Sequence, residues 1–204
     1  MTGPRIFLLS PASCGGERAR VLLREEASFP LAVELRERGA SLGEVFAFLS
    51  GLYFRGKLAY ARAFARPPAD LPGVLVITPT RGLADPATRV TRDDLLEFAG
   101  VDVATGGERY RGPLVRDVAS LAQAAGPDCP IVLLGSIATD KYLQVLRQEL
   151  GDRLRFPLEF VGRGDMSRGG LLLRCVEEGR ELTYAAVPGR RLRGTRPPKL
   201  PPRA

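Results

Sequence analysis

Three short, wholly apolar runs constrain the fold of this chain more than any other feature. They cover residues 6–9 (IFLL), 74–77 (VLVI) and 131–134 (IVLL), and each is followed at once by Ser, Thr or Gly. Strands that are buried on both faces have this character, because no polar residue alternates along them. We therefore predict three central strands of a largely parallel sheet.

Three weaker segments extend this pattern. Residues 154–161 predict a fourth strand, where Pro157 indicates a sheet edge or a bulge because proline cannot donate to the ladder. Residues 182–187 predict a fifth strand, and residues 31–35 predict a further one.

Helical segments lie between the predicted strands. Ser41 and Glu44 have the spacing of a capping box, and a second helix follows Gly51. The other predicted helices are one capped by Thr91 and stopped by Gly100, one with Pro113 in its first turn that runs to Gly126, one capped by Thr139 over 140–150, and one over 171–178. Strands that alternate with helices predict an α/β fold with a largely parallel, Rossmann-like sheet flanked by helices.

The chain has 204 residues and no histidine. This excludes Ser-His-Asp and Cys-His catalysis and any zinc site with a histidine ligand, and we predict no metal site. The three cysteines form no CxxC pair, and their odd number argues against a disulfide framework. With no signal peptide and no run that could span a bilayer, we expect a cytoplasmic protein without a membrane partner. The sequence identifies no cofactor.

The net charge of +7 is concentrated at the C-terminus. Residues 188–204 contain six basic residues and no acidic one, which leaves residues 1–187 close to neutral. We predict one α/β domain over 1–187 and a basic Pro/Arg-rich tail over 188–204. Such a tail either attracts nucleic acid without sequence preference or is simply solvated and flexible.

The segments that follow the predicted strands contain similar residues. Small residues, hydroxyls and arginines recur in 10–18, 78–86, 135–142 and 160–170. If the strands are parallel, these four segments meet at one edge of the sheet, where α/β proteins bind ligands. None contains the GxxxxGK[ST] motif of a P-loop or a complete GxGxxG fingerprint.

The segment 160–170 (FVGRGDMSRGG) is the strongest candidate for an anion site. Glycines let a ligand approach the backbone, a helix start offers N–H groups, and arginine forms a fork for phosphate. An ordinary turn with solvated arginines is the alternative. The candidate ligand-binding residues of all segments are Ser10, Cys14, Gly15, Gly16, Arg18, Lys57, Thr78, Thr80, Arg81, Gly82, Gly135, Ser136, Thr139, Arg163, Gly164, Ser167, Arg168 and Gly169, and the candidate catalytic residues are Asp165 and Asp140.

Two of these candidates have alternative interpretations. Cys14, beside a glycine pair, is either an activated thiolate or a small buried residue. Lys57 follows Gly56 within a predicted helix, where glycine costs about 1 kcal/mol relative to alanine. Either another group approaches the backbone at Gly56, or Arg55 and Lys57 form a solvated basic face.

The order of these motifs resembles bacterial domains related to the peroxide-stress YaaA-like proteins. The matching features are a Ser-x-x-Ser-Cys-Gly segment at 10–15, a helix containing Leu52-Tyr53-Phe54, Gly82-Leu83-Ala84-Asp85-Pro86, Gly135 with Lys141-Tyr142, and Phe156-Pro157-Leu158-Glu159 before the glycine-rich segment. The lysine that follows the cysteine motif in that family is replaced here by Glu17-Arg18, and no aromatic–aspartate pair occurs near 89–94. The resemblance implies an α/β domain that associates with nucleotide or nucleic acid, and it implies no reaction.

Three functions agree with these features. The first is a protein that binds a nucleotide or nucleic acid through a phosphate site, aided by the tail. The second is a glycosidase or transferase that acts on a nucleoside or modified base, with Arg163 and Arg168 on a phosphate and Asp165 or Asp140 as base or nucleophile. The third is an interaction module whose tail docks a partner.

Overall fold

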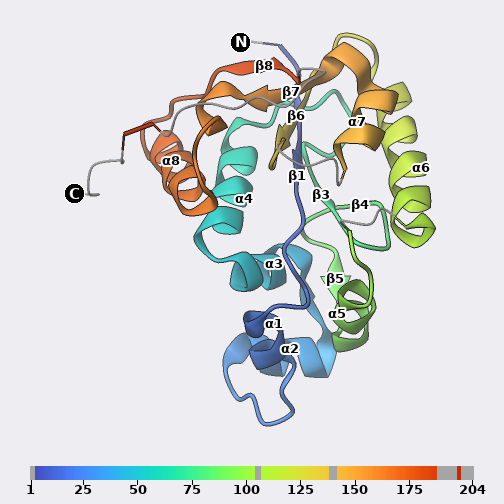
Figure 1. The fold of residues 1–204 in the computed structure, drawn as a ribbon, viewed down its shortest axis with the longest axis vertical. Coiled ribbons are helices and arrows are strands. Elements are labelled where there is room, and N and C mark those ends of the chain that lie inside the picture. The colour runs from blue at the N-terminus through green and yellow to red at the C-terminus, as the bar shows by residue number, and fades with distance from the viewer. Residues whose placement is uncertain (1–2, 104–106, 138–141, 188–196, 199–204) are drawn as a thin grey trace.

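The computed structural model describes residues 3–103, 107–137, 142–187 and 197–198 of the chain (Figure 1). A six-stranded sheet forms its centre. The strands of this sheet are β1 (Ile6–Leu9), β3 (Val74–Ile77), β4 (Leu83–Ala84), β6 (Ile131–Leu134), β7 (Leu154–Pro157) and β8 (Tyr184–Ala186), in the order β4-β3-β1-β6-β7-β8. The four inner strands are parallel to one another, and β4 and β8 are antiparallel to their neighbours. This is the predicted Rossmann-like α/β fold.

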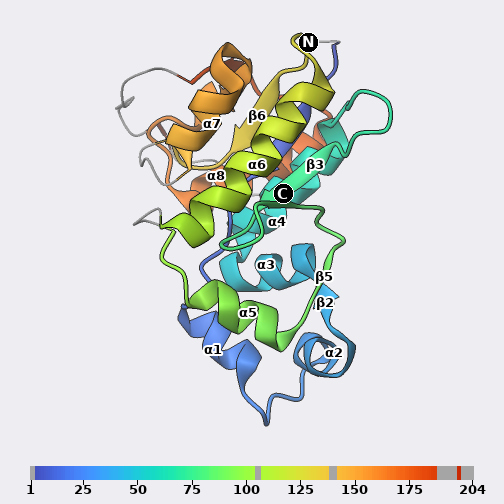
Figure 2. The same cartoon turned by 90° about the vertical axis from the view of Figure 1, so that its right-hand side faces the viewer.

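The helices cover both faces of the sheet and its lower end (Figures 1 and 2). They are α1 (Glu17–Leu23), α2 (Pro30–Arg38), α3 (Leu42–Ser50), α4 (Leu52–Phe64), α5 (Arg92–Ala99), α6 (Glu108–Ala125), α7 (Leu143–Leu150) and α8 (Asp165–Glu177). Helices α4 and α8 lie on one face, and α6 and α7 on the other. Helices α1, α2, α3 and α5, with the short β2–β5 ribbon (Ala40–Ser41 and Arg89–Val90), lie beyond the ends of the strands.

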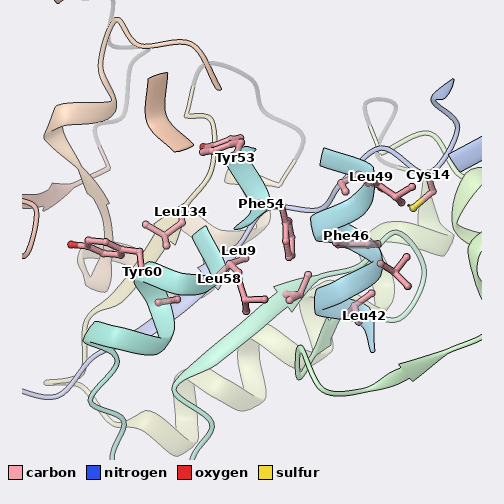
Figure 3. Close-up of a cluster of buried hydrophobic side chains, with 14 of the residues drawn as sticks. Leu9, Cys14, Leu42, Phe46, Leu49, Tyr53, Phe54, Leu58, Tyr60 and Leu134 are labelled. Carbon is pink, nitrogen blue, oxygen red and sulfur yellow. Dashed lines mark hydrogen bonds between the residues drawn. The ribbon is translucent and has the colours of Figure 1, made fainter. Parts of the chain in front are cut away.

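The central strands divide their side chains between two apolar layers. In β1, Phe7 and Leu9 pack into the layer under α4 and α8, whereas Ile6 and Leu8 pack under α6 and α7. Figure 3 shows the first layer continuing from Leu9 to Phe46 in the lower group of helices. Both faces of β1 are therefore buried, which explains its lack of polar residues.

Several sequence predictions about individual elements were wrong. Residues 31–35 are helical, because Pro30 opens α2 and its buried residues, Ala32 and Leu35, are one helical turn apart. Pro113 lies inside α6, which begins five residues earlier, so the carbonyl of Arg109 receives no intrahelical hydrogen bond from it. Pro157 is the last residue of β7, which is paired on both sides, so it marks a strand end and not a sheet edge.

Other local predictions were confirmed. Thr91 and Asp94 form a capping box at the start of α5, and Gly151 ends α7 with a positive φ of 52°. Ser41 caps α3 by accepting from the Glu44 amide, although the Glu44 carboxylate accepts from the serine hydroxyl and does not reach back to the backbone. No helix in the described part of the chain is both long and apolar enough to cross a bilayer.

Candidate functional site: a pocket at the switch point of the sheet

A pocket lies at the carboxyl ends of β1 and β6. From β1 the chain moves to β3 on one side, and it later returns past β1 to reach β6 on the other. The direction of strand addition therefore reverses between β1 and β6. In open α/β sheets, connections that leave such a switch point in opposite directions create a crevice where ligands bind.

This pocket has a volume of about 380 Å³. Its lining combines hydroxyls and aromatic rings with one amine and one carboxylate. The lining residues are Ser10, Pro11, Ala12, Ser13, Leu49, Ser50, Tyr53, Lys57, Val103, Ser136, Tyr142 and Asp165. We call this cavity the switch-point pocket. It joins the segments after β1 and β6 to the start of α8, so three of the four predicted segments meet there.

Lys57 is the most unusual residue of the pocket, because it is a buried cation with 1% of its surface exposed. Its amine lies 2.7 Å from the backbone carbonyl oxygen of Ser10 and 2.9 Å from the Ser10 Oγ. The same nitrogen lies 4.6 Å from the ring centroid of Tyr53 and 4.8 Å from that of Phe54. Figure 3 shows Tyr53 and Phe54 near the start of α4. The predicted alternative of a solvated basic face therefore fails for Lys57, although Arg55 is exposed.

Burial lowers the pKa of Lys57 from 10.5 to about 7. The negative charge of Asp165 acts in the opposite direction, and the positive charge of Arg168 lowers the pKa further. Among the described residues, Lys57 has no carboxylate within ion-pair distance. Near neutral pH the amine is thus present in both its charged and its neutral form.

Tyr142 completes the polar side of the pocket. It is buried, its hydroxyl donates to the backbone carbonyl of Ser136 at 3.0 Å, and burial raises its pKa to about 12. Gly135 allows this arrangement. A Cβ at that position would lie 2.7 Å from the Tyr142 hydroxyl and 2.9 Å from the Ser10 Cβ. The first residue after β6 is therefore glycine for a steric reason that concerns the site itself.

We expect Gly135→Ala to distort the switch-point pocket without unfolding the protein. The added methyl group must displace either the Tyr142 hydroxyl or Ser10, and both line the pocket. Far-ultraviolet circular dichroism should remain that of the wild type, whereas ligand affinity should fall about tenfold or more, because about 1.4 kcal/mol corresponds to a factor of ten. Unchanged affinity in isothermal titration calorimetry would contradict this prediction.

The structure places some predicted site residues beside the pocket and not in it. Cys14 and Gly15 line a neighbouring hollow of about 440 Å³, which also contacts Pro79 after β3. Gly16 is the residue before α1, and Arg18 donates to the backbone carbonyl of Phe48 at 3.2 Å. These residues lie between the end of β1 and the first turn of α1, beside the switch-point pocket.

Burial decides between the two interpretations of Cys14. The thiol is 6% exposed and lies 3.7 Å from the carbonyl oxygen of Ala12, and desolvation raises its pKa to about 12. An activated thiolate needs the opposite shift. Cys14 is therefore the small buried residue of the two alternatives.

The segment after β3 forms a turn with its own internal contacts. The Thr78 hydroxyl donates to the carbonyl of Gly82 and accepts from the amide of Arg81, and Thr80 lies within the same turn. The Arg81 guanidinium pairs with Asp94 and with Glu97 on α5. The predicted convergence of four segments on one cleft thus holds for three of them, and this fourth segment reaches only the neighbouring hollow, through Pro79.

The glycine-rich segment 160–170 is only partly a loop, because α8 begins at Asp165 and not at residue 171. Gly164 is its N-cap residue, and Ser167, Arg168 and Gly169 are helical. This boundary was missed because Gly169 and Gly170 suggested a loop. Gly169 allows close contact between α8 and α4, because a Cβ on it would lie 2.7 Å from the carbonyl oxygen of Leu52. Gly56 is glycine for the same reason, since a Cβ there would lie 2.7 Å from the carbonyl oxygen of Gly169.

Both arginines of this segment contact the protein itself. Arg163 donates to the backbone carbonyl of Glu159 at 3.1 Å and to the Ser167 hydroxyl at 3.1 Å. Arg168 donates to the carbonyl of Phe160 at 3.2 and 3.3 Å, and it lies 3.5 Å from the Asp165 carboxylate. Their guanidinium groups hold the start of α8 against the preceding 3-10 helix (Leu158–Phe160). Asp165 is the residue of this segment that lines the pocket.

Two predicted site residues, Asp140 and Thr139, lie outside the described residues. Within the described ranges, no group of three or more cysteine, aspartate or glutamate side chains is placed to hold a metal ion. Tyr53 and Tyr142 were not among the predicted site residues, although both line the pocket. The signals were present, since Tyr53 lies one helical turn before Lys57 and Tyr142 lies within the segment that follows β6.

Comparisons with known proteins do not identify the ligand. A scan against protein-family models, a search of curated proteins and a search of solved structures each found no match. The functional argument therefore depends on the geometry of the pocket.

Proposed function

We propose that this protein binds a compact nucleoside or nucleotide in the switch-point pocket. The observation that carries the proposal is the position of the pocket, between β1 and β6, with a buried lysine in its lining. A volume of about 380 Å³ suits a small ligand, and the mixture of rings and hydroxyls suits one that is partly flat and partly polar.

The charges of the pocket limit the kind of ligand. Among its described lining residues, Lys57 is the one cation and Asp165 the one carboxylate. Neither of the arginines predicted to contact phosphate, Arg163 and Arg168, lines the pocket, and both side chains donate to backbone carbonyls. The pocket therefore favours a nucleoside or a ligand with a single phosphate over a di- or triphosphate.

Binding of an anionic ligand should be accompanied by proton uptake. A negative charge near Lys57 raises its pKa from about 7 and converts the neutral amine to the ammonium form. An uncharged nucleoside produces no such uptake. The number of protons bound thus distinguishes a nucleotide from a nucleoside.

We expect a thermal-shift screen of nucleosides, nucleobases, nucleotides and sugar phosphates to reveal a stabilising ligand, because a ligand present at 100 times its Kd stabilises by about 2.7 kcal/mol. Calorimetry in two buffers of different ionisation enthalpy then measures proton uptake at pH 7.5. Lys57→Met should abolish that uptake. Arg55→Met is the matched control, since it removes an exposed positive charge from the same helix.

The proposal fails if no compound of these classes binds, or if Lys57→Met and Arg55→Met bind every ligand as the wild type does. Nucleic-acid binding by the tail remains a prediction, because residues 188–196 and 199–204 lie outside the described residues. The relationship to YaaA-like domains also remains a prediction.

A further inference from the structure

We propose that Ser10 and Lys57 form a nucleophile and general-base pair that cleaves a small carboxylic ester or amide. This inference rests on the proposed function, in that the substrate must enter the switch-point pocket. It adds a reaction to that pocket and makes the substrate class an acylated one.

The geometry of the pair supports this assignment. The Lys57 Nζ lies 2.9 Å from the Ser10 Oγ, and both residues line the pocket. Pairs of this kind generate a serine nucleophile without histidine, which this chain lacks. The two residues are 47 positions apart in the sequence and are brought together by the packing of α4 beside β1.

The second contact of the amine fixes its orientation. A neutral amine has two N–H donors and one lone pair. In the structure the Lys57 Nζ donates to the Ser10 carbonyl oxygen at 2.7 Å and to the Ser10 Oγ at 2.9 Å. When the amine is neutral, one N–H keeps the bond to the carbonyl, and the lone pair faces the Oγ and accepts the hydroxyl proton across the same contact. The backbone of the serine thus positions the base for its own side chain.

The proposed reaction has two steps. The Ser10 Oγ attacks the acyl carbon while its proton moves to the Lys57 Nζ, and the bond to the leaving alcohol or amine breaks as that group takes the proton from Lys57. Water then attacks the acyl-serine ester, again losing a proton to Lys57. The carboxylic acid departs, and the Ser10 Oγ recovers the proton.

The groups around Lys57 determine how the reaction depends on pH. Helix α8 contributes Asp165 and Arg168, whose charges act on Lys57 in opposite directions. Helix α4 contributes Tyr53, and the segment after β6 contributes Tyr142, whose pKa values burial raises, so both hydroxyls stay protonated near neutral pH. Lys57 is therefore the group of this set whose protonation changes near pH 7.

The test uses a small ethyl fluorophosphonate. This probe transfers its phosphonyl group to the oxygen of an activated serine and releases fluoride. The full-length protein is incubated with the probe from pH 5.5 to 8.5, and mass spectrometry locates and quantifies the adduct. The variants are Ser10→Ala, Lys57→Met and, as the control, Ser120→Ala, which removes a hydroxyl from the exposed side of α6. Circular dichroism confirms that each variant is folded.

We expect an adduct on Ser10 whose rate of formation rises about tenfold per pH unit below pH 7 and levels off above it. Lys57→Met should slow the reaction at least 100-fold, which is the lower range for loss of a general base. Ser10→Ala should form no adduct at this site, and Ser120→Ala should react at the wild-type rate.

Three results would overturn the inference: no adduct on Ser10 in the folded wild-type protein, an unchanged rate in folded Lys57→Met, or a wild-type rate that does not vary between pH 5.5 and 8.5. If Lys57→Met does not fold, the wild-type pH profile decides alone. Nucleoside binding in the thermal-shift screen without an adduct on Ser10 would retain the pocket and reject the reaction. An adduct without binding of any nucleoside or nucleotide would retain the reaction and reject the proposed ligand.

Discussion

Replacement of Lys57 by methionine is expected to stabilise the folded protein at pH 6 and to lose most of this advantage by pH 9. Methionine fills nearly the same space without a charge to desolvate, and the rings of Tyr53 and Phe54 remain as its neighbours. The variant loses the two hydrogen bonds to Ser10, at about 1 kcal/mol each. These losses reduce the expected increase in the free energy of unfolding to about 2 kcal/mol at pH 6.

The direction of the pH dependence follows from the two pKa values of Lys57. The pKa is about 7 in the folded protein and 10.5 in the unfolded chain, so the unfolded chain binds more protons between these values. The stability of the wild type therefore rises with pH across this window. The free-energy cost of burying the charged amine is fully present below pH 7. Between pH 6 and pH 9 the difference between variant and wild type should shrink by about 2–3 kcal/mol.

Urea denaturation at pH 6, 7.5 and 9 measures this difference. Arg55→Met is again the control, because it removes an exposed positive charge from the same helix. A difference that is constant over the three pH values would show that Lys57 is protonated in the folded protein at all of them.

A buried amine that reduces stability needs a reason other than packing. Natural proteins tolerate such groups mainly where a ligand or a reaction uses them. Lys57 lies in the lining of a pocket at the switch point of the sheet, in contact with a serine hydroxyl. The stability measurement therefore bears directly on whether this part of the molecule is a functional site.

The sheet could be predicted from the sequence because its central strands are buried on both faces. Residues 6–9, 74–77 and 131–134 were identified to the residue, since nothing polar interrupts them. Residues 31–35 were wrongly predicted as a strand, because a short apolar run fits a strand or a buried helix equally well. Pro30, at the first position of α2, was the available signal for a helix.

The site was only partly predictable. One pocket contains Ser10, Ser136 and Asp165, as was expected from their positions after parallel strands. The contact between Ser10 and Lys57 did not follow, because it depends on which turn of α4 packs against the end of β1. The engagement of Arg163 and Arg168 with backbone carbonyls was equally invisible, since a sequence does not show which cations are already paired.

Gly169→Ala is expected to destabilise the protein by about 3 kcal/mol, although alanine is the better helix former. A Cβ on Gly169 would lie 2.7 Å from the carbonyl oxygen of Leu52 and 2.9 Å from the Cα of Tyr53. Both atoms belong to the backbone of α4, which cannot rotate away as a side chain can. Helices α4 and α8 must therefore separate, and the contacts that hold Tyr53 and Asp165 at the pocket loosen with them.

Gly112→Ala is the matched control for this substitution, because Gly112 also lies within a helix, α6. There the added methyl group would meet only the end of the flexible Glu108 side chain, at 3.1 Å. The control should be stabilised by about 0.5–1 kcal/mol, because alanine reduces the conformational freedom of the unfolded chain. In a chain of this length, 3 kcal/mol corresponds to a fall in Tm of about 6–12 °C. Calorimetric melting that shifts both variants upward would show that α4 and α8 do not touch at Gly169, and the wall of the pocket formed by these helices would then have to be placed differently.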